Sequence, residues 1–224
     1  MSYVYMKALE KKAEKYDEGI DTLTRGKLKE LKQRVTEEFI EEGDEVLDVG
    51  MGTGTFAVMC ARKGAKVTGI DASEGMLEIA ERKIEEQGLE GLIEIRHMPV
   101  IELDETFPDQ RFDKASAMLV FSELYEKEQE FVLAQVHRIL KDRGEFILID
   151  EVKPQGTWKK ILYYLVRIPL VLLTFLKSRL TTKPLKHFED TLRSHNFMTL
   201  IEEPYLGNSL KMWVLKKRKK TEHE

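Results

Sequence analysis

Between residues 45 and 152, short apolar runs alternate with amphipathic stretches of helical length. The apolar runs span 46–49, 66–70, 93–95, 114–118 and 145–149, and the amphipathic stretches span 56–63, 73–87 and 127–140. Short apolar runs predict buried strands, and apolar residues three to four positions apart predict helices. This alternation predicts a mostly parallel sheet with helices on both faces. Gly64, Gly88 and Gly144 stand where each of these helices is expected to end.

Two further zones flank this alternation. Residues 8–42 carry apolar residues at helical spacing and predict an amphipathic helical lead-in. After residue 184, the pattern predicts a helix at 185–195 and strands at 197–201 and 209–215. A turn at Gly207 and Asn208 would join these strands into a hairpin at the edge of the sheet.

The predicted organisation is a helical lead-in, or lid, at 1–44, a main domain at 45–217 and a polar tail at 218–224. The main domain contains an insert at about 155–183. From 152 to 188 the chain has eight Lys or Arg residues and no acidic residue. Three interpretations stay open: helices broken at Pro169 that roof a pocket, peripheral contact with an anionic membrane surface, or docking of a protein or bulky apolar acceptor.

Composition narrows the classes of function. The 224 residues are 42% hydrophobic, which suits one large domain with a proper core. A single cysteine, Cys60, excludes an intramolecular disulfide and a cysteine-based zinc site, and we expect no bound metal. A formal net charge of −4 argues against nucleic-acid binding. The most apolar window, 161–176, contains Arg167 and is shorter than the roughly 20 residues of a spanning helix. We therefore expect a cytoplasmic protein.

The strongest local signal is a glycine loop at 50–54. An apolar strand enters a turn with glycine at alternate positions, Gly50, Gly52 and Gly54, and a helix follows. Glycine lets the backbone approach a ligand closely, and N–H groups at a helix start favour a negative group. Asp71 ends the next predicted strand, where it suits hydrogen bonds to both hydroxyls of a ribose. The pair predicts a nucleoside-bearing cofactor.

The glycine loop also fits, in part, a dinucleotide cofactor such as NAD. The run from Gly52 through Gly54 to Ala57 fits the dinucleotide pattern, so an NAD-dependent oxidoreductase stays an alternative. Asp48 argues against it, because a carboxylate two residues before Gly50 repels a pyrophosphate and attracts a cationic amino group. The chain also has only one such glycine loop.

Three segments resemble class I S-adenosylmethionine-dependent methyltransferases: DVGMGTG at 48–54, GIDASEGM at 69–76 and Phe112-Asp113. The resemblance covers about residues 40–152. It implies a Rossmann-like sheet of seven strands, mostly parallel with the last strand antiparallel, and S-adenosylmethionine as cofactor. It also implies methyl transfer to a small or apolar acceptor. A protein that binds S-adenosylmethionine without catalysis stays a further alternative.

The resemblance also assigns residues to the cofactor site. The glycine loop would lie along the methionine part with Asp48 near its amino group, Asp71 would hold the ribose, and Tyr16 would cover the methionine end from the lid. The family often has an acidic residue after the third strand, and this chain has Met98 there. The full expected set is Tyr16, Asp48, Gly50, Gly52, Gly54, Asp71, Ala72, Met76, Met98, Pro99, Met118 and Leu119.

The sequence assigns no catalytic residue. Methyl transfer from a sulfonium is an in-line displacement, so positioning supplies much of the acceleration, and a base is needed only for a protonated acceptor. Glu123 and His97 are the candidates for that base. Segments 2–7, 16–27 and 182–185 resemble the narrower family of corrinoid-protein-associated methyltransferases, which implies a corrinoid protein as a partner.

Overall fold

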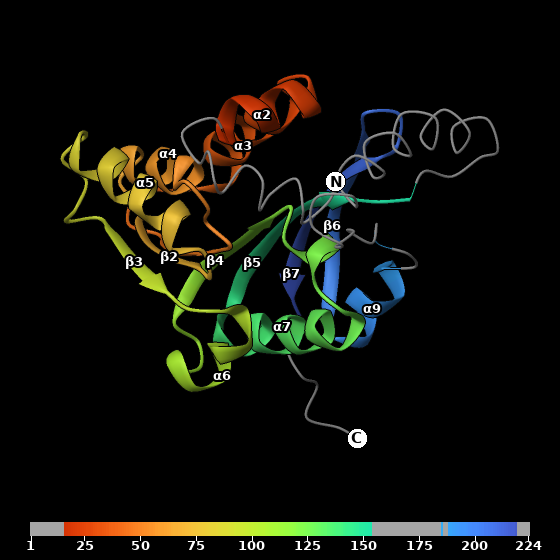
Figure 1. Cartoon of the computed structure of the whole chain (residues 1–224). Helices are drawn as coiled ribbons and strands as arrows, with labels where there is room; N and C mark the ends of the chain where they lie inside the picture. The colour runs from red at the N-terminus through yellow and green to blue at the C-terminus, as the bar shows by residue number, and fades with distance from the viewer. Residues whose placement is uncertain (1–15, 154–184, 186–187, 219–224) are drawn as a thin grey trace.

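The computed structural model describes residues 16–153, 185 and 188–218. Seven strands form one sheet in the order β3-β2-β1-β4-β5-β7-β6 (Figure 1). The strands are β1 (Glu45–Val49), β2 (Lys66–Asp71), β3 (Ile93–His97), β4 (Phe112–Met118), β5 (Leu140–Glu151), β6 (Phe197–Tyr205) and β7 (Leu210–Lys217). Of these strands, only β7 runs in the opposite direction, antiparallel to its neighbours β5 and β6. The predicted seven-stranded sheet with an antiparallel last strand is confirmed.

Helices cover both faces of the sheet (Figure 1). On one face lie α2 (Tyr16–Thr24), α3 (Lys27–Phe39), α4 (Thr55–Arg62) and α5 (Glu74–Glu85), and on the other lie α6 (Leu103–Thr106), α7 (Glu126–Ile139) and α9 (Phe188–Ser194). Short 3₁₀ turns, η2 (Val100–Glu102) and η3 (Phe121–Glu123), follow β3 and β4.

The central strands are apolar on both sides because successive side chains point to opposite faces. In β5, Phe146 and Leu148 face the α7 side, whereas Ile147 and Ile149 face the α4 side, and all four are fully buried. A continuous apolar run therefore fits a strand covered by helices on both faces. This burial pattern explains why unbroken apolar runs in the sequence predicted the strands correctly.

The described part of the helical lead-in consists of two helices, α2 and α3. Arg25 and Gly26 between them have positive φ angles of 52° and 73°, which end α2 and turn the chain into α3. Arg34 of α3 then reaches the far end of the sheet. Its Nη1 lies 2.5 Å from Glu203 Oε2 and donates to the Tyr205 hydroxyl at 2.9 Å. These contacts join α3 to the edge strand β6.

Gly144 and the turn at Gly207 and Asn208 differ in how they compare with the sequence predictions. Gly144 does not end a helix: it lies inside β5, and an added Cβ would come within 3.0 Å of Asp113 O. Close packing against the neighbouring strand β4 explains this glycine. The turn at Gly207 and Asn208 is confirmed, and both residues have positive φ. However, β7 lies between β5 and β6, so β6 is the edge strand. The insert at 155–183 lies outside the described residues.

Candidate functional site

The glycine loop lies at the carboxyl ends of β1, β2 and β4, which are neighbours in the sheet. Gly50 has a φ of 67°, and an added Cβ would come within 2.5 Å of Val120 Cγ2, so only glycine lets the loop meet the turn after β4. Gly52 differs, because an added Cβ there would meet nothing within 4 Å. The backbone at Gly52 therefore faces open space at the edge where open α/β sheets bind ligands.

Asp71, at the tip of β2, holds the glycine loop while keeping acceptor capacity. Its Oδ2 accepts a hydrogen bond from Gly52 N at 2.8 Å, and its Oδ1 accepts one from Ser73 N at 2.9 Å. Burial raises the pKa of Asp71, although these backbone hydrogen bonds act in the opposite direction. A carboxylate has about four lone-pair sites, so Asp71 can accept about two more hydrogen bonds. This capacity suits the two hydroxyls of a ribose.

Asp48 of β1 is 3% exposed and only half satisfied. Ser116 Oγ donates to its Oδ1 at 2.7 Å, whereas its Oδ2 has no hydrogen-bond partner within the described part of the chain. Burial raises the pKa of Asp48 to about 6. A buried acceptor without a partner is costly, so this oxygen indicates a ligand that donates a hydrogen bond. The ammonium group at the amino-acid end of S-adenosylmethionine fits that requirement.

A cluster that sequence reasoning missed joins α2 to the glycine loop. Asp17 accepts hydrogen bonds from Thr53 Oγ1 at 2.8 Å, Thr55 Oγ1 at 3.2 Å and Lys83 Nζ at 2.6 Å. Burial alone would raise the pKa of Asp17, but the hydrogen bond and charge of Lys83 hold it below its ordinary value. These four residues form the Asp17 cluster. The neighbouring Tyr16 is half-buried on the same side of the sheet, in the predicted lid.

Lys32 of α3 was also missed. This half-buried residue lies in the electrostatic field of three carboxylates, those of Asp48, Asp17 and Asp21. Burial lowers the pKa of Lys32, and the carboxylates act in the opposite direction. One signal in the sequence could have identified it. Lys32 stands four residues after Leu28, on the apolar stripe of its helix, where an ordinary surface lysine is not expected.

The candidates for a general base lie at two different strands. Glu123 is half-buried in η3, which follows β4 at the edge that carries the glycine loop. The fully buried Asp150 holds this turn, because its Oδ2 accepts a hydrogen bond from Ser122 N at 3.2 Å. Burial raises the pKa of Asp150 to about 6. His97, in contrast, is exposed at the tip of β3, with its Nε2 3.1 Å from Ala72 O.

The other expected cofactor residues line the same edge of the sheet. Met76 and Met98 are buried, and Met98 N donates to Asp71 O at 3.0 Å, which brings the segment of Met98 and Pro99 against the tip of β2. Met118 ends β4 and Leu119 follows it with a φ of 63°, a strained conformation for a leucine. Such strain often marks functional sites.

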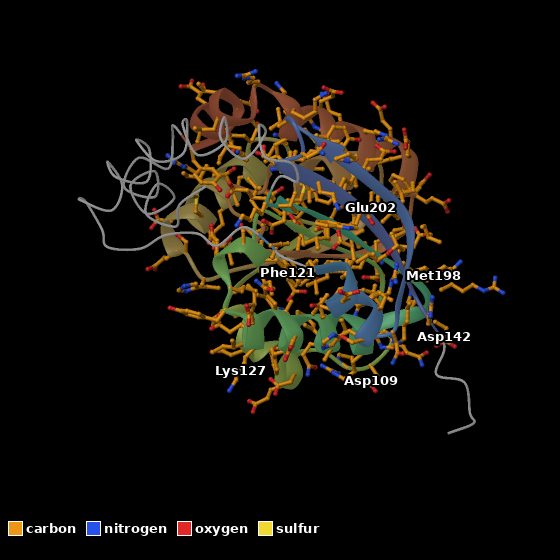
Figure 2. All side chains as sticks on the ribbon, turned by 90° about the vertical axis from the view of Figure 1, so that its right-hand side faces the viewer. Asp109, Phe121, Lys127, Asp142, Met198 and Glu202 are labelled. Carbon is orange, nitrogen blue, oxygen red and sulfur yellow. The ribbon has the colours of Figure 1, made fainter. Side chains whose placement is uncertain are left out.

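Two clefts lie at the edge of the sheet opposite the glycine loop. One of about 820 Å³ is lined by residues of α7 and by residues close to the starts of β4 and β6, among them Asp109 and Asn196. Figure 2 shows Asp109 and Asp142, which also lines this cleft, well apart from Phe121. Within the described ranges, no three metal-ligating side chains come together, and no helix has the length and apolar character needed to cross a membrane.

Comparisons with known proteins agree with this geometry. The Methyltransferase domain family matches residues 46–144. The phosphatidylethanolamine N-methyltransferase of Cereibacter sphaeroides is 39% identical over 126 residues, which are 56% of this chain and 60% of that protein. The demethylmenaquinone methyltransferase of Symbiobacterium thermophilum is 27% identical over 87% of this chain and 79% of that protein. The chain thus spans about 60% of the length of the first relative.

Solved structures show the same fold at low sequence identity. An S-adenosylmethionine-dependent methyltransferase from Aquifex aeolicus has a TM-score of 0.60 at 20% identity, over 83% of this chain and 88% of that one. The 4+2 cyclase SpnF has a TM-score of 0.67 at 20% identity, over 84% and 80%. A neighbour called a cyclase shows that this fold alone does not decide the reaction. Residues 46–144 of this chain thus match the Methyltransferase domain family, and its fold is one that S-adenosylmethionine-dependent methyltransferases share.

Proposed function

We propose that this protein is an S-adenosylmethionine-dependent methyltransferase that acts on a small or apolar acceptor. The observation that carries the proposal is the buried Oδ2 of Asp48, which has no hydrogen-bond partner among the described residues. It lies two residues before the glycine loop, and Asp71 on the next strand retains acceptor capacity. The two carboxylates suit the ammonium and the ribose hydroxyls of S-adenosylmethionine. NAD has a pyrophosphate rather than an ammonium group, so it would leave Asp48 unsatisfied.

The proposed division of labour follows from this arrangement. When bound, S-adenosylmethionine supplies a methyl group on a sulfonium, which an acceptor atom can attack in line. The chain's own residues would then hold the cofactor in place. Asp71 would bind the ribose, Asp48 would bind the amino group, and α2 would cover the methionine end. Alignment of this kind supplies much of the rate acceleration. If the acceptor atom carries a proton, Glu123 in η3 is placed to accept it, and Asp150 positions that turn.

The names of two relatives support an apolar acceptor. Phosphatidylethanolamine and demethylmenaquinone both carry long apolar chains, and the relatives named for them match this chain over 56% and 87% of its length. The insert at 155–183, with apolar residues and an excess of basic ones, would suit such an acceptor or a membrane surface. Membrane contact, a corrinoid partner and a cytoplasmic location stay predictions.

Two measurements test the proposal. Calorimetry with S-adenosylhomocysteine and with NAD decides the cofactor, and binding of NAD alone would contradict our proposal. Methyl-labelled S-adenosylmethionine is then incubated with phosphatidylethanolamine vesicles and with demethylmenaquinone in detergent. Label in either lipid supports the proposed class of acceptor. Tight binding of S-adenosylhomocysteine without label in any acceptor would instead favour a protein that binds this cofactor without catalysis.

A further inference from the structure

Asp48 and Lys32 present opposite charges to the same place in the fold. Side chains alternate along β1, so Asp48 shares a face with Val46, whose apolar cluster contains Leu31 and Val35 of α3. Lys32 follows Leu31 on that helix, and its ammonium lies in the field of Asp48. Lys32 therefore lies on the side of β1 that α3 covers, within the electrostatic field of the Asp48 carboxylate and close to the glycine loop.

The described residues leave hydrogen-bonding capacity unused on both charged groups. Among the described residues, none donates a hydrogen bond to Asp48 Oδ2, and none accepts one from Lys32 Nζ. Lys83, the other lysine close by, differs because its ammonium donates to Asp17 at 2.6 Å and to Thr55 at 3.0 Å. Charged groups away from water normally use their hydrogen-bonding capacity, so a carboxylate and an ammonium that each keep some unused suit a ligand that carries both charges.

We propose that Lys32 binds the carboxylate at the amino-acid end of the cofactor while Asp48 binds its ammonium group. This inference rests on the proposed function and names a residue that the glycine-loop pattern does not contain. A free α-amino acid end is a zwitterion, with an ammonium and a carboxylate on one carbon. Lys32 would thereby let the site distinguish S-adenosylmethionine and S-adenosylhomocysteine from nucleosides without that end.

The test compares three ligands by calorimetry: S-adenosylhomocysteine, its decarboxylated analogue S-adenosyl-3-thiopropylamine, and 5′-methylthioadenosine, which lacks both charges. Lys32→Gln should weaken S-adenosylhomocysteine about 10- to 100-fold, the usual effect of losing a hydrogen bond to a charged group. It should change the affinity for the other two ligands less than about threefold, since neither carries the carboxylate. Lys29→Gln, on an exposed position of the same helix, is the matched control and should leave all three affinities unchanged.

Other outcomes would overturn the assignment. Equal weakening of all three ligands in Lys32→Gln would show that the lysine only supports the fold, and loss of the carboxylate preference in Lys83→Gln alone would move the role to Lys83. If Lys32→Gln does not fold, Lys32→Arg replaces it and should retain the preference. The wild-type protein gives an independent test, because equal affinity for S-adenosylhomocysteine and its decarboxylated analogue refutes the proposal. Failure of all three ligands to bind would instead refute the proposed function.

Discussion

At the scale of one residue, Asp48 lowers the stability of the ligand-free protein, because its buried carboxylate suits a ligand. Its side chain is 3% exposed, and burial raises its pKa to about 6. One of its oxygens has a partner, Ser116 Oγ, and the other has none in the described structure. Without ligand, the charged form is therefore disfavoured in the folded state relative to the unfolded chain. Such local penalties are expected at binding sites and are offset by stabilising contacts elsewhere.

We predict that Asp48→Asn stabilises the ligand-free protein above pH 7 by about 2–3 kcal/mol, because each pH unit of raised pKa corresponds to about 1.4 kcal/mol. The folded pKa lies above the unfolded value, so the penalty is complete above about pH 6 and disappears as the pH falls toward 4. The gain should therefore be present at pH 8 and absent near pH 4. Urea unfolding at both pH values measures it.

Asp104→Asn is the matched control, since Asp104 is exposed on the surface of α6. It should change the free energy of unfolding little at either pH. Asp48→Asn should also abolish tight binding of S-adenosylhomocysteine, so its gain in stability and its loss of affinity come from the same carboxylate. A variant that is no more stable than wild type at pH 8 would show that Asp48 is satisfied in the folded protein.

We also predict that Asp71→Ala weakens binding of the cofactor. It removes the proposed acceptor for the ribose and the acceptor of the Gly52 N–H. We expect the affinity for S-adenosylhomocysteine to fall by about 1.5–3 kcal/mol, the range for a hydrogen bond to a charged group. Calorimetry measures the loss. Glu74→Ala, on the exposed first turn of α5, is the control and should bind like wild type. Undiminished affinity in Asp71→Ala would mean that the ribose lies elsewhere.

At the scale of elements, the sequence predicted correctly those strands and helices that a local pattern of apolar residues determines. Strands β1 to β5 and helices α4, α5 and α7 followed from apolar runs and helical spacing, whereas the short helix α6 was not predicted. Asp71 was predicted from its position at a strand end. The Asp17 cluster was not predicted, because its partners lie 36, 38 and 66 residues from Asp17 along the chain. Gly144 was misjudged for a related reason: a glycine required by close packing looks in sequence like one that ends a helix. Contacts between distant elements need the fold to be known first.

The Asp17 cluster predicts how α2 behaves. We expect Asp17→Ala to loosen α2 from the glycine loop, because it removes the acceptor shared by Thr53, Thr55 and Lys83. Amide hydrogen exchange in α2 should become faster, while exchange in β4 and β5 should not change. Glu18→Ala is the matched control, since Glu18 is the exposed neighbour on the same helix. Equal protection of α2 in both variants would mean that its apolar contacts alone hold it.

At the scale of the whole molecule, the N-terminal helices connect parts of the fold that lie far apart. Arg34 fastens α3 to Glu203 on the edge strand β6, and Asp17 fastens α2 to the glycine loop after β1. Asp71 in turn joins that loop to β2. A ligand that contacts Asp71 and Asp48 would therefore add contacts between elements on both sides of the loop. Its effect should extend to the stability of the whole chain.

We accordingly predict that S-adenosylhomocysteine at about 100 times its Kd stabilises the folded protein by about 2.7 kcal/mol, because it binds the folded state and not the unfolded chain. For a chain of this size, that corresponds to a rise in Tm of about 5–11 °C. Thermal unfolding monitored by circular dichroism measures the shift. NAD at the same concentration should give none, and Asp71→Ala should lose most of it. A Tm that rises with NAD but not with S-adenosylhomocysteine would show that the carboxylates at these strand ends serve a different nucleotide.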